Sequence, residues 1–145
     1  MAENGIRLRI LAPERIFYEG DVTMVELTTT EGDMGILPGH IPTTCVIAPG
    51  VLTIYEANKE GAVGDAQEKK SIRKAALHSG FLEIRPNEVS VLAQVVEWPE
   101  EIDVHRAEEA QIRAERRLKQ SDSNMARAEL SLKRALIRLK VGKGS

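Results

Sequence analysis

The sequence predicts an α+β protein in which an N-terminal antiparallel β-sandwich, or flattened barrel, precedes a C-terminal antiparallel two-helix hairpin. Many short apolar-alternating runs, separated by turns rich in Gly, Pro and Asn, predict the sheet part. Two stripes of Ala and Leu at helical spacing between residues 102 and 141 predict the hairpin. Because the residue before a proline disfavours helix, Trp98 and Pro99 mark the boundary. We expect one domain over residues 1–98 and a second over residues 99–145.

The strands are predicted from alternation and from β-branched residues. Ile6, Leu8 and Ile10 alternate with arginines, and residues 22–30 are rich in Val and Thr. The other candidate strands are residues 44–47, 51–55, 71–78, 81–84 and 89–95. Turns are expected at residues 19–21 and 85–88. Two further segments are expected to lack regular structure: residues 31–42, which are dense in Gly and Pro, and residues 58–70, an exposed hairpin loop.

The two helices are predicted by matching apolar stripes and by capping residues. The stripes are Ala107, Ala110, Ala114 and Leu118 on the first helix, and Ala128, Leu132, Ala135 and Leu139 on the second. Asp103 is a good N-cap for the first helix, and residues 121–124, all of capping types, should join the two. Gly142 and Gly144 are expected to end the second helix.

Each apolar stripe is accompanied by a column of arginines. The columns are Arg106, Arg113 and Arg117 on the first helix and Arg127, Arg134 and Arg138 on the second. Each arginine directly precedes a stripe residue, so each column flanks its apolar seam on the same side of the helix. Arginines arranged in this way are suited to an anionic ligand or surface. The pattern therefore indicates a docking or sensing element rather than a catalytic one.

The balance of charged residues changes near the same boundary, at about residue 102. Residues 103–145 hold 11 Lys and Arg against 6 Asp and Glu, whereas residues 1–102 hold 9 against 16. An acidic body with a basic tail is able to dock the tail on an acidic partner. The single cysteine, Cys45, excludes an internal disulfide framework. No apolar run approaches the roughly 20 residues that span a bilayer, and the N-terminus has no signal or transit peptide character.

The sequence shows no constellation typical of a catalytic or metal site. His40 lies in a Gly/Pro loop, and the other two histidines, His78 and His105, have no cysteine or carboxylate at metal-ligand spacing. Residues 32–35 lack the lysine and the following helix of a phosphate loop. We therefore expect no catalytic residues, no metal and no catalytic cofactor.

Three motifs in the right order give this chain a family resemblance. They are GDMGILPGHIP at residues 32–42, SGFLEI at residues 79–84 and IDVHRA at residues 102–107. Together they resemble the epsilon subunit of the bacterial F-type ATP synthase, over residues 6–141. The resemblance implies a sandwich of about ten strands that binds the gamma subunit and the ring of c subunits. It also implies a hairpin that folds on the sandwich or extends towards the alpha/beta catalytic hexamer, where the extended form restrains ATP hydrolysis.

The same resemblance implies ATP as a regulatory ligand between the hairpin and the sandwich. The matching positions are Glu97, Ile102, Asp103, Arg106, Ala107, Arg113, Arg134 and Arg138. The inhibitory contact to the catalytic subunits would be made by Arg113, Arg117, Arg127, Arg134 and Arg138. A weakly packed hairpin is a candidate bistable element, and an anion among its arginines would stabilise the folded form.

Two alternatives remain open on the residues alone. The basic hairpin would suit nucleic-acid phosphates, although interleaved glutamates and the lack of hairpin aromatics count against this. A free-standing enzyme built on the sandwich would need turnover without partners. We expect no nucleic acid, contact with the membrane only through the complex, and a peripheral location on the cytoplasmic face of a bacterial cell membrane.

Overall fold

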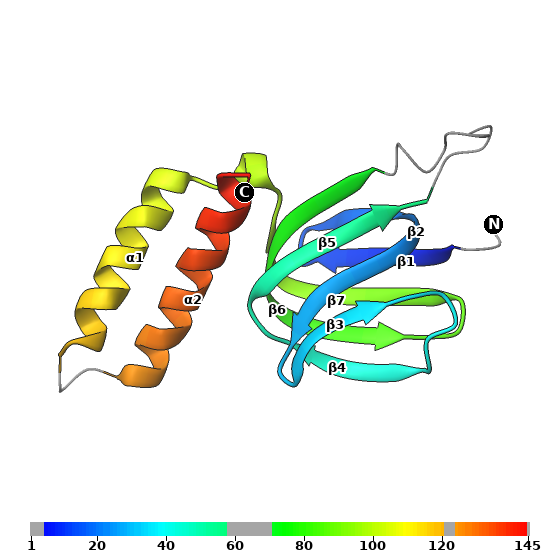
Figure 1. Ribbon diagram of the computed structural model, residues 1–145, viewed down its shortest axis with the longest axis horizontal. Coiled ribbons are helices and arrows are strands. Elements are labelled where there is room, and N and C mark those ends of the chain that lie inside the picture. The colour runs from blue at the N-terminus through cyan, green and yellow to red at the C-terminus, as the bar shows by residue number, and fades with distance from the viewer. Residues whose placement is uncertain (1–4, 58–70, 121–123, 145) are drawn as a thin grey trace. The chain divides into compact units, whose positions relative to one another are not determined.

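The computed structural model describes residues 5–57, 71–120 and 124–144. The predicted 58–70 loop lies outside these residues. The chain divides into two compact units, residues 1–96 and residues 97–145. The strands are β1 (Ile6–Ala12), β2 (Arg15–Thr29), β3 (Gly32–Ile36), β4 (Thr43–Ile47), β5 (Gly50–Glu56), β6 (Ile72–Ile84) and β7 (Glu88–Glu97). A short 3-10 turn, η2 (Pro99–Glu101), precedes the helices α1 (Val104–Leu118) and α2 (Met125–Gly142). The predicted class, a sandwich followed by two helices, is confirmed (Figure 1).

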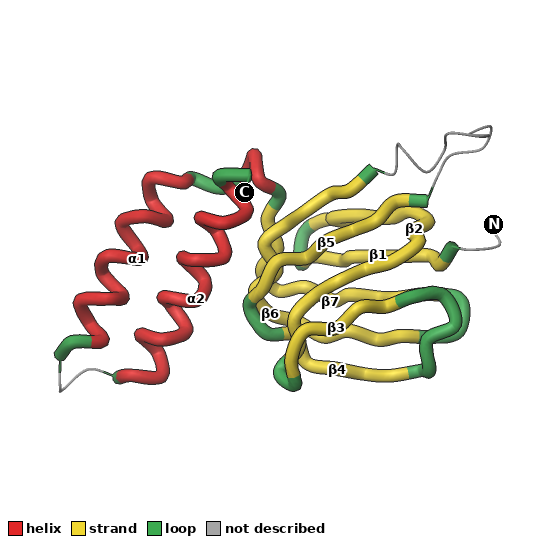
Figure 2. The backbone as a smooth tube through the Cα atoms, in the orientation of Figure 1, coloured by secondary structure: helices red, strands yellow, loops and turns green. Residues whose placement is uncertain are grey.

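Two long strands, β2 and β6, pass through both layers of the sandwich. The first part of β2 pairs with β1, and its later part pairs with β5 and β3. Likewise β6 pairs first with β5 and then with β4 (Figure 2). This sharing corrects the expected count, because seven strands are present in the described residues where about ten were expected. A long strand that serves both layers takes the place of two short ones.

Two local predictions in the sandwich were wrong. The expected turn at residues 19–21 lies inside β2, where a register shift between Val22 and Met24 bends the strand instead of ending it. Part of the Gly/Pro-dense stretch forms β3, because its backbone pairs with residues 25–29 of β2. The turn expected at residues 85–88 is confirmed by two backbone hydrogen bonds that Arg85 and Glu88 exchange.

The sandwich core consists of the inward-facing aliphatic residues of both layers. Alternate residues are buried in β1 and in β7 as far as Ala93, as the alternating pattern predicted, but Val95 is only half-buried and Val96 is buried instead. Fully buried side chains include Leu8, Ile10, Val22, Val25, Leu52, Ile54, Leu82 and Val91.

The two helices pack against each other through small residues. Ala107 and Ala114 of α1 and Ala128 and Ala135 of α2 are all at most 3% exposed. Alanine lets two helix backbones approach closely but buries little apolar area. Both helix starts are capped, since Asp103 accepts the Arg106 N–H at 3.0 Å and Asn124 accepts the Arg127 N–H at 3.1 Å. The predicted seam and caps are therefore present.

A buried tyrosine gives the sandwich a dependence on alkaline pH. The Tyr18 hydroxyl donates to Glu56 Oε2 at 2.8 Å, and burial together with this bond raises the pKa of Tyr18. A raised pKa means that the contribution to stability is complete below about pH 10 and is lost as the pH rises through the folded-state value.

We predict that Tyr18→Phe lowers the free energy of unfolding at neutral pH by about 1–2 kcal/mol, because Glu56 loses a donor. The variant should also lose part of the decline in stability above about pH 10. Urea unfolding at pH 7 to 11 measures both effects. Tyr55→Phe is the control, since Tyr55 donates to Glu26 at an exposed position and should cost less. An unchanged alkaline slope in Tyr18→Phe would contradict the assignment.

Candidate functional site

The predicted ligand residues all belong to the C-terminal unit, and Glu97, Ile102 and Asp103 lie in or beside the segment that leads into α1. Trp98 donates its backbone N–H to the Glu101 carboxylate at 2.8 Å, and Ile102 N–H donates to Pro99 O at 3.2 Å. These bonds shape a single tight turn between β7 and α1. Asp103 follows and is used as the N-cap of α1. The turn therefore brings Glu97, the last residue of β7, close to the start of the hairpin.

The structure joins two of the predicted residues directly. Arg138 Nε donates to Glu97 Oε1 at 2.7 Å, and both side chains are about one-third exposed or less. A charge-assisted hydrogen bond of this length is stronger than a hydrogen bond between neutral groups. In this conformation Glu97 supplies the counter-charge of Arg138, so an anionic ligand would have to compete with it or be held alongside it.

Arg134 lies one helical turn before Arg138 and is partly buried. Its Nε is shielded from solvent and has no hydrogen-bond partner among the described residues. A buried donor without an acceptor is costly, and it marks a position where a ligand oxygen would accept a hydrogen bond. Because Arg134 and Arg138 are like charges at i and i+4, an anion between them would also relieve their repulsion.

The predicted residues on α1 are arranged differently. Arg106 and Arg113 are exposed, and Arg113 lies 4.0 Å from the Glu109 carboxylate. Ile102 and Ala107 are buried, 9% and 3% exposed, so their present role is packing. The Asp103 carboxylate is engaged with the Arg106 backbone. The eight residues thus divide into an ion pair, an unpartnered guanidinium nitrogen, two exposed arginines, a cap and two packing residues.

The residues predicted to contact catalytic subunits also separate by exposure. Arg113, Arg117 and Arg127 are exposed, whereas Arg134 and Arg138 are half-buried. The five arginines therefore differ in how far a partner surface could reach them. The sequence could not separate them, because all five occupy equivalent positions beside an apolar stripe.

An exposed row of apolar side chains on the sandwich was missed from the sequence. Leu11 of β1 pairs with Leu92 of β7, and Val46 of β4 pairs with Phe81 of β6. β6 and β7 are neighbouring strands joined by the turn that the Arg85 and Glu88 bonds close, and counting back from that turn places Phe81 and Leu92 at corresponding positions. The two backbones are close here, since a Cβ placed on Gly80 would lie 2.1 Å from the Leu92 carbonyl oxygen.

We call Leu11, Leu92, Phe81 and Val46 the apolar row. Phe81 and Leu92 are 55% and 53% exposed, Val46 is 47% exposed, and Leu11 is half-buried. The neighbouring row on the same face is polar, since Arg9 pairs with Ser90 and Thr44 pairs with Glu83. Apolar side chains that lie side by side and are bordered by polar ones are typical of a protein interface. Only strand register brings these four residues together, so no local sequence pattern could have found them.

Neither a metal-binding cluster nor a membrane-spanning helix occurs in the described parts of the chain. Within residues 5–57, 71–120 and 124–144, no group of three His, Cys, Asp or Glu residues could hold a metal ion. No helix in these ranges is long and apolar enough to cross a membrane.

Comparison with known proteins gives matches over nearly the whole chain. Residues 5–99 match the family described as ATP synthase, Delta/Epsilon chain, beta-sandwich domain, and residues 100–143 match its long alpha-helix domain. The ATP synthase epsilon chain of Caldanaerobacter subterraneus subsp. tengcongensis is 45% identical, over 96% of this chain and 94% of that protein. The epsilon chain of Halalkalibacterium halodurans is 41% identical, over 94% and 96% respectively.

Solved structures have the same fold. A chain of the Euglena gracilis mitochondrial ATP synthase aligns with a TM-score of 0.73 and 23% identity, over 92% of this chain and 78% of that one. A chain in the central stalk and c-ring structure of the Tetrahymena thermophila mitochondrial ATP synthase aligns with a TM-score of 0.61 and 13% identity, over the full length of both.

The Asp103 cap gives a prediction for the hairpin alone. Asp103→Ala should destabilise α1 by about 1 kcal/mol, because the Arg106 N–H loses its acceptor. Asp103→Asn should cost little, since asparagine caps about as well as aspartate. Amide exchange in the first turn of α1 measures the difference. Equal exchange in the two variants would show that the cap does not hold the helix start.

Proposed function

Because this chain belongs to the delta/epsilon chain family of ATP synthases, we propose that it is a non-catalytic central-stalk subunit of a proton-translocating F-type ATP synthase. The observation that carries the proposal is the 45% identity to an epsilon chain over 96% of the sequence. In this role the sandwich joins the gamma subunit and the c-subunit ring, and so helps to couple the rotor to the alpha/beta catalytic head. The subunit is peripheral, attached to the cytoplasmic face of a bacterial membrane through the complex.

The apolar row is proposed as the surface that binds gamma. A stalk subunit that turns together with its partner needs a lasting interface, and lasting interfaces are more apolar than transient ones. The row offers three well-exposed apolar side chains on neighbouring strands, with polar residues at its border. This arrangement resembles the buried centre and polar rim of a protein interface.

The row predicts a specific defect in assembly. Phe81→Ser should weaken binding to the gamma subunit about tenfold or more, because an aromatic anchor is lost at the middle of the interface. Ile72→Ser is the matched control, since Ile72 lies on the same strand, is 53% exposed and is outside the row. Equal binding by the two variants, measured by calorimetry with purified gamma, would remove the row from the interface.

The hairpin is proposed to restrain ATP hydrolysis when it extends towards the catalytic subunits. Its seam consists largely of alanines, so the folded form is only weakly stabilised by burial. The exposed Arg113, Arg117 and Arg127 provide positive charge for an acidic partner surface, and Arg134 and Arg138 would join them on extension. A switch requires weak packing and charged side chains whose exposure differs between its two states, and the hairpin would have both.

ATP is proposed as the ligand that favours the folded hairpin. The support comes from Arg134, whose buried Nε has no acceptor, and from Arg138 one turn later. A triphosphate would give both guanidinium groups oxygen acceptors, and Glu97 or Asp103 would accept from the adenine amino group or the ribose. A ligand shifts a two-state hairpin only as far as it prefers one state, so binding must favour the folded form.

A titration tests the ATP proposal. Trp98, the only tryptophan, lies next to Glu97 and reports on the site by its fluorescence. ATP should give a saturable change, ADP a weaker one, and Arg134→Ala should lose about tenfold or more in affinity. Arg127→Ala is the matched control, because Arg127 is an exposed arginine on the same helix outside the proposed ligand set.

A flat response to ATP, confirmed by calorimetry, would contradict the ligand role. The hairpin would then be a brake governed by rotation and partner contacts alone.

A further inference from the structure

The last residue of α2 is a glycine that its own backbone does not require. Gly142 ends α2, as the sequence predicted. Glycine is common at helix ends, usually because it adopts a left-handed backbone there. Gly142 does not, because the glycines with positive φ in the described residues include Gly144, at +72°, but not Gly142. A glycine at this position therefore has another reason.

The reason is close approach to the segment before α1. A Cβ added at Gly142 would lie 2.9 Å from Val104 Cγ2 and 3.1 Å from Ile102 Cγ2. Real side-chain atoms do not approach so closely without moving a neighbour. All three residues belong to the C-terminal unit, and Figure 1 shows the end of α2 beside the turn that leads into α1. The last turn of α2 therefore rests directly on residues 102–104.

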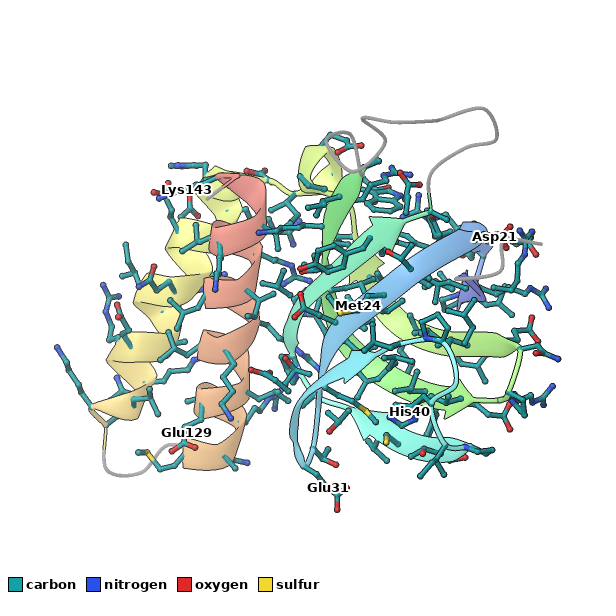
Figure 3. The ribbon with its side chains drawn as sticks, turned by 45° about the vertical axis from the view of Figure 1, so that its right-hand side comes forward. Asp21, Met24, Glu31, His40, Glu129 and Lys143 are labelled. Carbon is teal, nitrogen blue, oxygen red and sulfur yellow. The ribbon has the colours of Figure 1, made fainter. Side chains whose placement is uncertain are left out.

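Two ion pairs flank this contact. Lys143 Nζ lies 3.4 Å from Glu108 Oε2, and Arg138 joins Glu97 four residues before Gly142. Lys143 marks this end of α2 in Figure 3, and Glu129 marks the other end. Exposed ion pairs contribute little to stability on their own, so the Lys143–Glu108 pair mainly restricts the orientation of the last turn of α2. The steric fit at Gly142 is the specific part of the contact.

We propose that the last turn of α2 is a latch, formed by Gly142 and Lys143 against Ile102, Val104 and Glu108, that must open before the hairpin can extend. The alanine seam between the helices buries little area, so a contact at the open end of the hairpin has a large share in keeping α2 beside α1. The regulatory consequence of the latch, a lower tendency to inhibit hydrolysis, rests on the proposed function, whereas the latch itself is a property of the isolated chain.

The test uses substitutions of Gly142 that would stabilise α2 as a helix but would disrupt the latch. Gly142→Leu raises intrinsic helix propensity, so without a latch it should slow amide exchange in α2. With the latch, the leucine cannot fit against Val104, and exchange across residues 125–142 should become about tenfold faster or more. Gly142→Ala should give a smaller increase. The experiment is hydrogen exchange on the full chain without ATP.

Two further variants make the result specific. Val104→Ala combined with Gly142→Leu should recover much of the protection, because Val104 Cγ2 is the nearest obstructing atom. Lys140→Leu is the control, since it adds a leucine to the same turn at an exposed position and should leave exchange unchanged. Unchanged exchange in the sandwich amides shows that each variant remains folded.

The outcomes separate the latch from the nucleotide proposal. Slower or unchanged exchange in Gly142→Leu overturns the latch, whatever ATP does. Faster exchange without recovery in the double variant also overturns it, because the proposed latch requires Val104 to be the nearest obstruction. Faster exchange with recovery supports the latch even where the ATP titration is flat.

Discussion

The close approach of α1 and α2 through alanines is the constraint on which the hairpin depends. Ala107, Ala114, Ala128 and Ala135 let the helix backbones come together, yet each removes only a small apolar area from water. A seam of leucines would bury more apolar area. An alanine seam leaves a larger share in the proposed switch to charges and end contacts, besides the buried Leu139 and Val141 of α2.

The arginines of α2 beside this seam differ in their partners. This difference determines how the hairpin would respond to an anion. Glu97 neutralises Arg138, whereas the buried Nε of Arg134 has no acceptor in the described residues. A buried donor without an acceptor is unfavourable, and an anion would satisfy it. In the proposed switch, Arg134 would therefore favour a ligand in the folded state or a partner in the extended state.

The hairpin was predictable from sequence and the sheet was less so, for a physical reason. Helix signals are local: capping by Asp103 is read within one turn, and a stripe of period 3.6 is read within a single helix. Strand pairing is not local, so the expected turn at residues 19–21 became a bend within β2, and part of a Gly-rich stretch became β3. The apolar row depends on register across four strands. The burial of Arg134 depends on helix rotation, which equivalent positions beside a stripe do not specify.

The contacts that close the hairpin differ in what can weaken them. The Glu97–Arg138 pair is ionic, so an anion competes with it and salt screens it. The fit of Gly142 against Val104 and Ile102 is steric and apolar, so neither salt nor an anion acts on it directly. In the proposed switch, the ion pair would be the part that responds to a ligand, and the fit at Gly142 would be the part that sets the resting bias. Because the two are separated along α2, the resting bias can be changed at Gly142 while the arginines that would bind an anion remain intact.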